Sequence, residues 1–505
     1  MDLKPFQQEA LDLLRRYLEA ARVQGPVLPF ASLAVEGNPG YPVAHYHSVP
    51  GLEAVPYICL RLPTGCGKTF LASETVGIAA RAILEREFPV VLWLVPSKTI
   101  RAQTVDALKR ATHPYRKQMD LRFRGRVGVY DLSEFTQIRP QDLTDQACIV
   151  VATIQSFRVS DTEGCKLYDH SEAFETHFAR VDPHTSGLEQ NTPESGRTGP
   201  KYSFANLLYL HRPLIIVDEA HNARTDLAYS LLRAVNPACI VELTATPKLD
   251  GRFPSNVLYR VAADRVKAAE MIKLPINLTE FRSDWRAAVA AAVEARKRLL
   301  DLAAGEQPDF VRPIVLFQAQ NADREVTVEV LRQHLIENER VPAERIAIAT
   351  GDQRGLDGID LIDPTCPIDH VITVQALKEG WDCPFAYVFC SVADVQSQTA
   401  VEQLLGRVLR MPYARKRKAE ALNQAYAFVS SDRFGTAAGA LRDKMVEGMG
   451  FERDQAAFAV VQSEPEGLFG TRLAEGEAPR PILGHYELQE EPDLSALDAS
   501  ELAPA

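Results

Sequence analysis

The sequence feature that most constrains the fold is the run Arg61-Leu-Pro-Thr-Gly-Cys-Gly-Lys-Thr-Phe70. It follows an apolar stretch, Tyr57-Ile-Cys-Leu60, and it leads into a helix-like sequence over residues 68–87. A strand, a glycine-bearing turn and a helix in this order direct several backbone N–H groups and the positive end of the helix toward one point. Phosphate groups bind at such points. The run therefore predicts a site for a nucleoside triphosphate at the end of a parallel strand.

The predicted phosphate loop consists of Thr64, Gly65, Cys66, Gly67, Lys68 and Thr69. Its glycines would let the backbone approach the phosphates of ATP, its lysine would reach the β- and γ-phosphates, and its last threonine would ligate Mg²⁺. We interpret Cys66 as a small residue that is tolerated at a variable position. Leu62 stands where the longer form of this motif has its first glycine, so the match is to the shortened form P-T-G-x-G-K-T. Taken alone, the motif leaves an ordinary turn before a helix as the alternative.

A second apolar run, residues 214–217, ends in the adjacent carboxylates Asp218 and Glu219. Phosphoryl transfer requires charge neutralisation and an aligned attacking water, so we predict that Asp218 holds Mg²⁺ and that Glu219 acts as the base. A strand that ends in a polar loop is the alternative, but the position downstream of the phosphate loop favours the catalytic interpretation. Residues 239–244 form a further apolar run that leads to Thr244 and Thr246, which would link the nucleotide site to a bound strand.

In this order the motifs resemble those of the superfamily 2 helicases and translocases, and Asp218-Glu-Ala-His221 resembles their DEAH form. The resemblance extends from Gln7 to about Pro412. It implies that Gln7 reads the adenine, that Ser97 and Thr153 grip a nucleic-acid strand, and that His221 takes part with Thr244 and Thr246 in coupling.

Three further segments, residues 315–320, 373–384 and 403–410, resemble the motifs of the second lobe in this superfamily. The resemblance implies that Thr373 contacts nucleic acid and that Gly380 and Asp382 bind the nucleotide. It also implies that Arg407 and Arg410 stabilise the charge on the γ-phosphate when the lobes close. Gln403 would sense the γ-phosphate or a water molecule.

Residues 377–382 (Leu-Lys-Glu-Gly-Trp-Asp) and 406–413 (Gly-Arg-Val-Leu-Arg-Met-Pro-Tyr) are most similar to the restriction subunit of Type III restriction enzymes. This resemblance implies an ATP-dependent helicase or translocase acting on DNA, with a methyltransferase or a separate nuclease as partner. Those subunits carry a carboxylate-lysine nuclease domain after the motor. Here only 93 residues follow Pro412, and they contain no Asp-x-Lys or Glu-x-Lys triplet. DNA cleavage by this chain is therefore in doubt.

Apolar β-like runs alternate with helix-like stretches in two sets, near 57–62, 90–95, 148–152, 214–218 and 239–244, and near 313–318, 345–349, 370–374, 386–391 and 425–430. This alternation predicts an α/β fold of two tandem RecA-like (P-loop NTPase) domains, with parallel sheets covered by helices. We predict an N-terminal helix and loop over 1–50 and a first lobe over 51–250 with a polar surface insertion at about 160–210. A linker over 251–285, a second lobe over 286–435 and a C-terminal extension over 436–505 with an acidic, disordered tail complete the prediction.

The formal net charge of −11 looks unfavourable for binding nucleic acid, but it is concentrated at one end of the chain. Residues 463–505 hold ten acidic and two basic residues, so the rest of the chain has a formal net charge of only −3. Phosphate contacts require a local basic surface, and Arg410 with Arg415-Lys-Arg-Lys418 would supply one. A solvated helix face is the alternative for this basic cluster.

The remaining expectations concern location and rival functions. No apolar run reaches the roughly 18 to 20 residues that span a bilayer, and Met1-Asp-Leu-Lys does not resemble a signal peptide, so we expect no membrane association and a cytoplasmic location. The cysteines form no C-x-x-C pair, which favours reduced thiols. An RNA-directed ATPase shares every predicted catalytic residue and stays an alternative. A nucleotide-gated scaffold with little turnover is a second one, which the presence of Lys68, Asp218, Glu219 and Arg407 disfavours.

Overall fold

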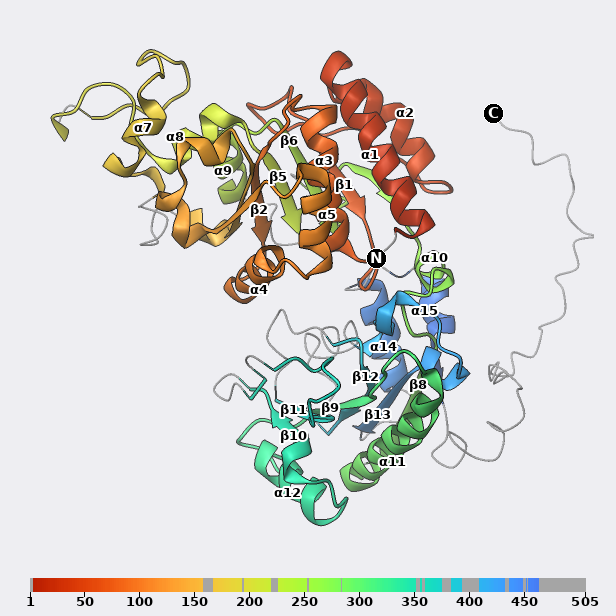
Figure 1. Ribbon diagram of the computed structural model, residues 1–505. Helices are drawn as coiled ribbons and strands as arrows, with labels where there is room; N and C mark the ends of the chain where they lie inside the picture. The colour runs from red at the N-terminus through yellow and green to blue at the C-terminus, as the bar shows by residue number, and fades with distance from the viewer. Residues whose placement is uncertain are drawn as a thin grey trace, which may run out of the picture.

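The computed structural model describes residues 3–157, 167–192, 195–218, 226–251, 254–282, 284–350, 355–356, 359–374, 383–392, 408–431, 436–447, 451 and 453–462. Two lobes lie one above the other, and each is built on a sheet with helices on both faces (Figure 1). All strand pairs in both sheets are parallel. The prediction of two tandem RecA-like α/β domains is therefore confirmed.

The first sheet has the strand order β3-β4-β2-β5-β6-β1-β7. Its strands are β1 (Tyr57–Arg61), β2 (Val90–Val95), β3 (Val127–Asp131), β4 (Ala147–Thr153), β5 (Leu214–Asp218), β6 (Cys239–Thr244) and β7 (Val257–Arg260). Most of these strands are rich in valine, isoleucine and leucine and are buried along their length, as expected for a parallel sheet covered on both faces.

Helices cover both faces of the first sheet (Figure 1), and alternate strand residues belong to two different buried clusters, one in each layer. Ile58, Leu60 and Trp93 pack in the layer of α1 and α3, whereas Leu92 and Ile215 pack in the layer of α8 and α9. The helices of this lobe are α1 (Pro5–Gln24), α2 (Val27–Gly37), α3 (Lys68–Ala82), α4 (Lys98–Lys109), α5 (Pro114–Phe123), α7 (Glu175–Phe178), α8 (Phe204–His211) and α9 (Asp226–Val235).

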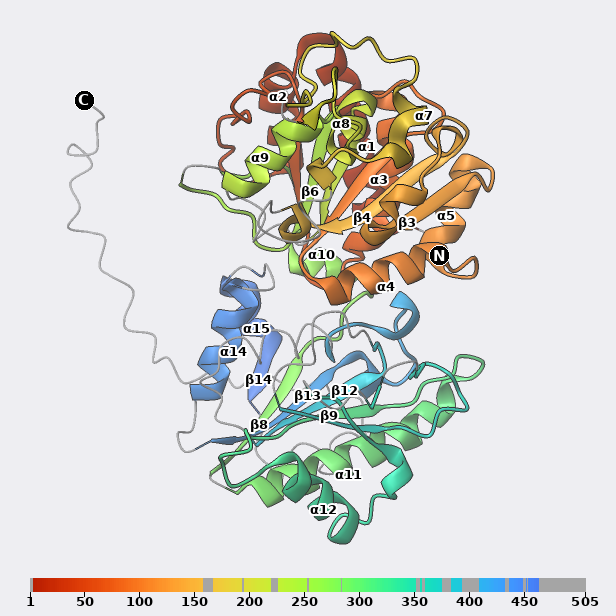
Figure 2. The same ribbon diagram turned by 90° about the vertical axis from the view of Figure 1, so that its left-hand side faces the viewer.

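The second sheet has the order β10-β11-β9-β12-β13-β8-β14. Its strands are β8 (Ile276–Arg282), β9 (Ile314–Gln318), β10 (Ile346–Ile348), β11 (His370–Thr373), β12 (Ala386–Ser391), β13 (Ala425–Ser431) and β14 (Val460–Gln462). Helix α10 (Ala263–Ala268) precedes the sheet in the chain, and α11 (Trp285–Ala303), α12 (Val328–Glu337), α14 (Thr436–Glu447) and α15 (Arg453–Ala459) follow its strands. Figure 2 shows α11 and α12 on one side of this sheet and α14 and α15 on the other.

The hydrophobic core is continuous between the lobes. One cluster of buried side chains extends from α1 and the first sheet to Leu316 of the second sheet, and it includes Met271 and Ile272 between the sheets. Two smaller clusters fill the layer of α8 and α9 and the layer of α11 and α12. In the part of the chain that the structure describes, no helix combines the length and the apolar composition required to cross a membrane.

Every β-like run that the sequence predicts coincides with a strand, but β3, β7, β8 and β14 were not predicted. The strands that were predicted are continuous apolar runs. Strand β8 has the sequence Ile-Asn-Leu-Thr-Glu-Phe-Arg, in which Asn277, Thr279 and Glu280 interrupt the apolar residues and are nevertheless buried, and the strand lies between β13 and β14. Strands β7 and β8 therefore lie within the segment 251–285 that we predicted as a linker, and β14 lies within the predicted C-terminal extension.

The insertion predicted at about 160–210 as a surface segment contributes buried apolar side chains to the core of the first lobe. Among its described residues, Leu167, Phe174 and Phe178 are buried in the same cluster as Phe204 at the start of α8. The rings of Phe174 and Phe204 stack with their centroids 6.2 Å apart. Turn-forming residues surround these aromatic side chains in the sequence, which is why composition alone indicated a surface segment.

Candidate active site

The predicted phosphate loop connects the end of β1 to the start of α3, and it requires both of its glycines. Gly65 has a φ of 88° and Gly67 a φ of 79°, values that L-residues with a side chain rarely adopt. A Cβ atom at Gly65 would lie 2.8 Å from Cγ2 of Ile272, and one at Gly67 would lie 2.9 Å from Nε2 of Gln7. Backbone conformation and close packing thus both select glycine, in agreement with the predicted close approach to phosphates.

Gln7, predicted to read the adenine, lies directly against the phosphate loop. Its Nε2 donates a hydrogen bond to the carbonyl oxygen of Cys66 at 2.8 Å, and its Oε1 accepts one from the backbone N–H of Lys4 at 2.9 Å. The Sδ atom of Met271 lies 3.9 Å from the same Nε2. Both ends of the Gln7 amide are therefore engaged by the protein, so this side chain holds the loop to the start of α1.

The residues predicted to bind Mg²⁺ come together from two strand ends. Thr69, in the first turn of α3, donates its hydroxyl to Oδ2 of Asp218, the last residue of β5, over 3.2 Å. Lys68 and Asp218 are 8% and 6% exposed, so water screens their charges little. A threonine hydroxyl and a carboxylate are hard oxygen donors of the kind that Mg²⁺ accepts, so the residues present fit this ion.

Several predicted site residues lie outside the described part of the chain. They are Glu219, His221, Gly380, Asp382, Gln403 and Arg407. Three of them are next to a described residue in the chain: Glu219 follows Asp218, Asp382 precedes Cys383, and Arg407 precedes Val408.

Arg410 brings the second lobe to the phosphate loop. Its backbone forms an antiparallel bridge with Ile272, and its Cγ lies 3.9 Å from the position that a Cβ at Gly65 would occupy. A guanidinium group attached at this point is suited to an anion held by the loop, because it carries a charge at all ordinary pH values and several N–H donors. The described residues of the site thus come from both lobes.

The predicted coupling and strand-gripping residues that the structure describes lie at or just beyond the carboxyl ends of strands. Thr244 ends β6, between β1 and β5, and its Oγ1 accepts a hydrogen bond of 3.2 Å from the backbone N–H of Thr246. Ser97 caps α4 by accepting from the N–H of Ile100 at 3.4 Å. Thr153 and Thr373 end β4 and β11, and both side chains are buried. As placed, these two threonines would act through their neighbours rather than by direct contact with a strand.

Sequence reasoning missed Arg101, which joins the two first-lobe segments predicted to grip nucleic acid. From α4, its Nε pairs with a carboxylate oxygen of Asp131 at 3.1 Å, and another guanidinium nitrogen donates to Ser156 at 3.4 Å. The Ser156 hydroxyl in turn lies 2.8 Å from that of Thr153. Only the position of Arg101 one helical turn after Ser97 could have indicated this role, since its partners are distant in the sequence.

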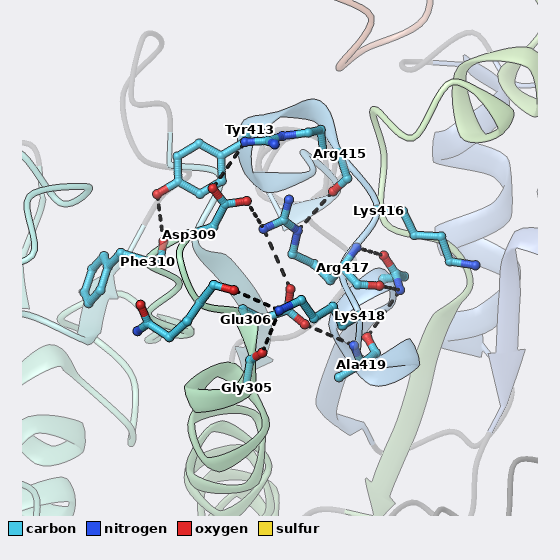
Figure 3. A network of polar contacts seen from close by, with 12 residues as sticks. Gly305, Glu306, Asp309, Phe310, Tyr413, Arg415, Lys416, Arg417, Lys418 and Ala419 are labelled. Carbon is cyan, nitrogen blue, oxygen red and sulfur yellow. Dashed lines mark hydrogen bonds and ion pairs between the residues drawn. The ribbon is translucent and has the colours of Figure 1, made fainter.

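Most of the basic cluster Arg415-Lys-Arg-Lys418 is engaged by groups of the second lobe, which the sequence prediction did not foresee (Figure 3). Arg415 and Arg417 pair with Asp309 at 3.2 and 3.0 Å. Lys418 donates to the carbonyl oxygens of Gly305 and Gln307 just beyond α11. The cluster therefore joins the segment after the arginine motif to the end of α11. Composition could not show this, because the acidic partners lie about a hundred residues earlier.

Comparisons with known proteins are consistent with this site. A family model described as the res subunit of Type III restriction enzymes matches residues 1–249. No curated protein matches the chain.

Three solved structures are similar at 13% identity over 92% of this chain. The first is the Type ISP restriction-modification enzyme LlaBIII bound to DNA, with a TM-score of 0.48 and 31% of its length covered. The second is a fragment described as an HsdR subunit of a type I restriction enzyme from Vibrio vulnificus YJ016, with a TM-score of 0.45 and 69% of its length covered. The third is Dbp5 of S. cerevisiae bound to RNA and ADP BeF3, with a TM-score of 0.42 and 94% of its length covered. This chain thus spans less than a third of the length of LlaBIII. The first 249 residues of this chain thus match the family model of Type III restriction enzyme res subunits.

Proposed function

We propose that this protein is an ATPase that couples ATP hydrolysis to movement along DNA, as a helicase or translocase of the Type III restriction subunit type. The observation that carries the proposal is the meeting of Arg410 from the second lobe with Gly65 of the phosphate loop. A nucleotide bound between two lobes can change their relative position during a hydrolysis cycle, whereas one bound within a single domain cannot.

Each described group has a role in this proposal. ATP bound with Mg²⁺ supplies the phosphoryl group whose transfer to water releases free energy. Lys68 would neutralise phosphate charge, and Thr69 and Asp218 would hold the metal ion. The contact of 3.2 Å between these two side chains supports a shared ligand position. Arg410 and Arg407 would stabilise the charge that develops during transfer, which in related enzymes contributes on the order of 10³ to 10⁵ in rate.

We propose that Glu219 is the base that orients and deprotonates the attacking water. Its position next to Asp218, at the end of β5, supports this role. Gly380, Asp382 and Gln403 would complete the nucleotide contacts, and His221, Thr244 and Thr246 would link them to the nucleic-acid path.

The proposed nucleic-acid path runs across the carboxyl ends of β4 and β11, near Ser97, Thr153 and Thr373. The linked side chains of Arg101, Ser156 and Thr153 support a path of fixed shape on the first lobe. DNA is the proposed substrate because of the match to the res subunit family, and a methyltransferase or a separate nuclease is the proposed partner.

Replacing Glu219 by Gln tests the reaction. We expect ATP turnover to fall by roughly 10²- to 10⁴-fold, because the water loses its base, while nucleotide affinity stays close to that of the wild type. Glu344→Gln, at an exposed position, is the matched control and should leave turnover unchanged. Unaltered turnover in Glu219→Gln would refute the role of Glu219.

The substrate is tested by measuring wild-type ATP turnover with duplex DNA, single-stranded DNA and RNA in parallel. We expect DNA to stimulate turnover, and stimulation by RNA alone would overturn the assignment. Displacement of a third strand from a DNA triplex reports movement along a duplex, and release of a strand from a forked duplex reports unwinding.

A further inference from the structure

Residues 271–273, here called the connector, form a short link between the two sheets. The connector runs antiparallel to residues 409–411, at the end of the arginine motif. The backbone N–H of Lys273 donates to the carbonyl oxygen of Leu409 at 2.6 Å, and that of Met411 donates to the carbonyl oxygen of Met271 at 2.9 Å. Ile272 and Arg410 form the bridge between these hydrogen bonds. The chain that leaves the first lobe therefore holds the backbone of Arg410.

The connector also touches the phosphate loop. Cγ2 of Ile272 lies 2.8 Å, and Cγ of Arg410 lies 3.9 Å, from the same ideal Cβ position at Gly65. Met271 lies beside Gly67 and Gln7, with its Cε 3.6 Å from the Cβ position at Gly67. Ile272 is thus packed between the phosphate loop and the backbone segment that carries Arg410, and its side chain is almost completely buried.

Lys273 fixes the connector to the second lobe. This side chain is 0% exposed, and its ammonium group donates to the carbonyl oxygens of Pro384 and Ala386 at 2.9 and 2.6 Å. The same group lies 3.9 Å from the centroid of the Tyr387 ring. Breaking charged hydrogen bonds in a buried position is costly, so the connector cannot slide relative to β12 without a large penalty. The second lobe therefore sets the position of the connector, while the side chains of Met271 and Ile272 pack against the phosphate loop of the first lobe.

We propose that Ile272 is a positioning residue that sets the distance between Arg410 and the phosphate loop. The proposal rests on the proposed function for its effect on hydrolysis. The side chain does not touch a reacting atom. It acts as a spacer, because the connector backbone is fixed by Lys273 and the loop backbone by Gln7 and the packing around Gly65. A shift of about 1 Å in a group that contacts a transition state can cost on the order of 10²-fold in rate.

Three substitutions of Ile272 separate spacing from mere hydrophobicity. Ile272→Ala removes Cγ2, and we expect kcat for ATP to fall roughly 10- to 100-fold with a change in KM of less than about twofold. Ile272→Val keeps the β-branch and therefore Cγ2, and it should restore kcat to within about twofold of the wild type. Ile272→Leu keeps the volume but moves the branch, so it should give an intermediate kcat.

Ile314→Ala is the matched control for lost packing. Ile314 lies fully buried in β9, so its truncation also lowers the thermal stability of the second lobe. We expect its kcat per folded molecule to equal that of the wild type. Equal losses of kcat in Ile272→Ala and Ile314→Ala would overturn the proposal, and so would a kcat of Ile272→Ala within twofold of the wild type.

Hydrogen exchange gives a reading that does not depend on hydrolysis. In full-length protein without nucleotide, we expect Ile272→Ala to speed exchange of the Lys273 and Met411 amides by at least about tenfold while the amides of β12 keep their protection. Ile314→Ala should not produce this pattern. If the wild type hydrolyses no ATP, the proposed function fails, and the exchange experiment alone decides the inference. Unchanged exchange at both amides would then refute it.

Discussion

Arg417 provides the sharpest test of how the segment after the arginine motif is held. Its side chain is 3% exposed, and its guanidinium lies 3.0 Å from a carboxylate oxygen of Asp309 and 3.8 Å from one of Glu306. Glu306 is as deeply buried as Arg417, whereas the side chain of Asp309 is 23% exposed. Replacing Arg417 by Met keeps a long apolar side chain but leaves the buried Glu306 carboxylate without its cation and leaves Asp309 with Arg415 alone.

The expected loss of stability follows from this burial. Removing one member of a buried ion pair costs about 3–5 kcal/mol, and the partial hydration of Asp309 favours the lower value. A loss of about 3 kcal/mol lowers the melting temperature of a domain of roughly 150–250 residues by about 6–12 °C. We therefore expect Arg417→Met to lower the melting temperature of the second lobe by about this amount in differential scanning calorimetry.

The control for Arg417→Met is the exposed pair of Arg16 and Glu36, whose side chains are 39% and 55% exposed. Arg16→Met should lower the melting temperature much less than Arg417→Met does, because water screens an exposed pair. Adding Glu306→Gln to Arg417→Met should recover part of the loss, since one buried charge is then removed. If Arg417→Met melted like Arg16→Met but bound DNA more weakly, the cluster would be a phosphate-binding surface after all, and the structural argument would be refuted.

Three further predictions follow from the site and from α8. Gln7→Ala should weaken the binding of ATP and GTP by similar factors, because the amide holds Cys66 and Lys4; in a nucleotide titration, a loss confined to ATP would instead indicate contact with the adenine. Asp218→Asn should raise the Mg²⁺ concentration needed for half-maximal nucleotide binding, and an unchanged Mg²⁺ titration would exclude Asp218 as a ligand. Burial next to Arg86 lowers the pKa of His211 to about 4 from 6.5. The unfolded chain then binds a proton that the folded chain does not, so stability should fall as the pH drops from about 6.5 toward 4, and urea titrations of His211→Asn should show a smaller fall.

The elements predicted well from the sequence are those whose signal is local. The phosphate loop is specified by glycines, a lysine and a threonine within six consecutive positions, and the buried strands by short apolar runs. Thr69 and Asp218 were also paired correctly as neighbours, because in a parallel sheet the loops that follow β1 and β5 emerge at the same edge.

The features that the sequence did not reveal depend on pairs of residues far apart in the chain. Ile272 meets Arg410, and Arg417 meets Asp309 across 108 positions. Neither Ile272 nor Asp309 has an unusual composition around it, and a basic run carries no indication of whether carboxylates will face it. Strand β8 escaped prediction for a related reason, since neighbouring strands bury and satisfy polar residues such as Asn277, which donates to Gln424 at 2.8 Å.

The place of β8 in its sheet has a consequence for synthesis of the protein. It is the earliest strand of the second sheet in the chain, yet it lies between β13 and β14, which come last. While the ribosome adds the roughly 140 residues between Arg282 and Ala425, both hydrogen-bonding edges of β8 lack their native partners, and the edge that pairs with β14 stays unpaired until Val460 has been added. Unpaired strand edges recruit other chains, so nascent protein at this stage is the form most prone to aggregate. Truncation before Val460 would make that condition permanent on one side, because β14 would then be missing.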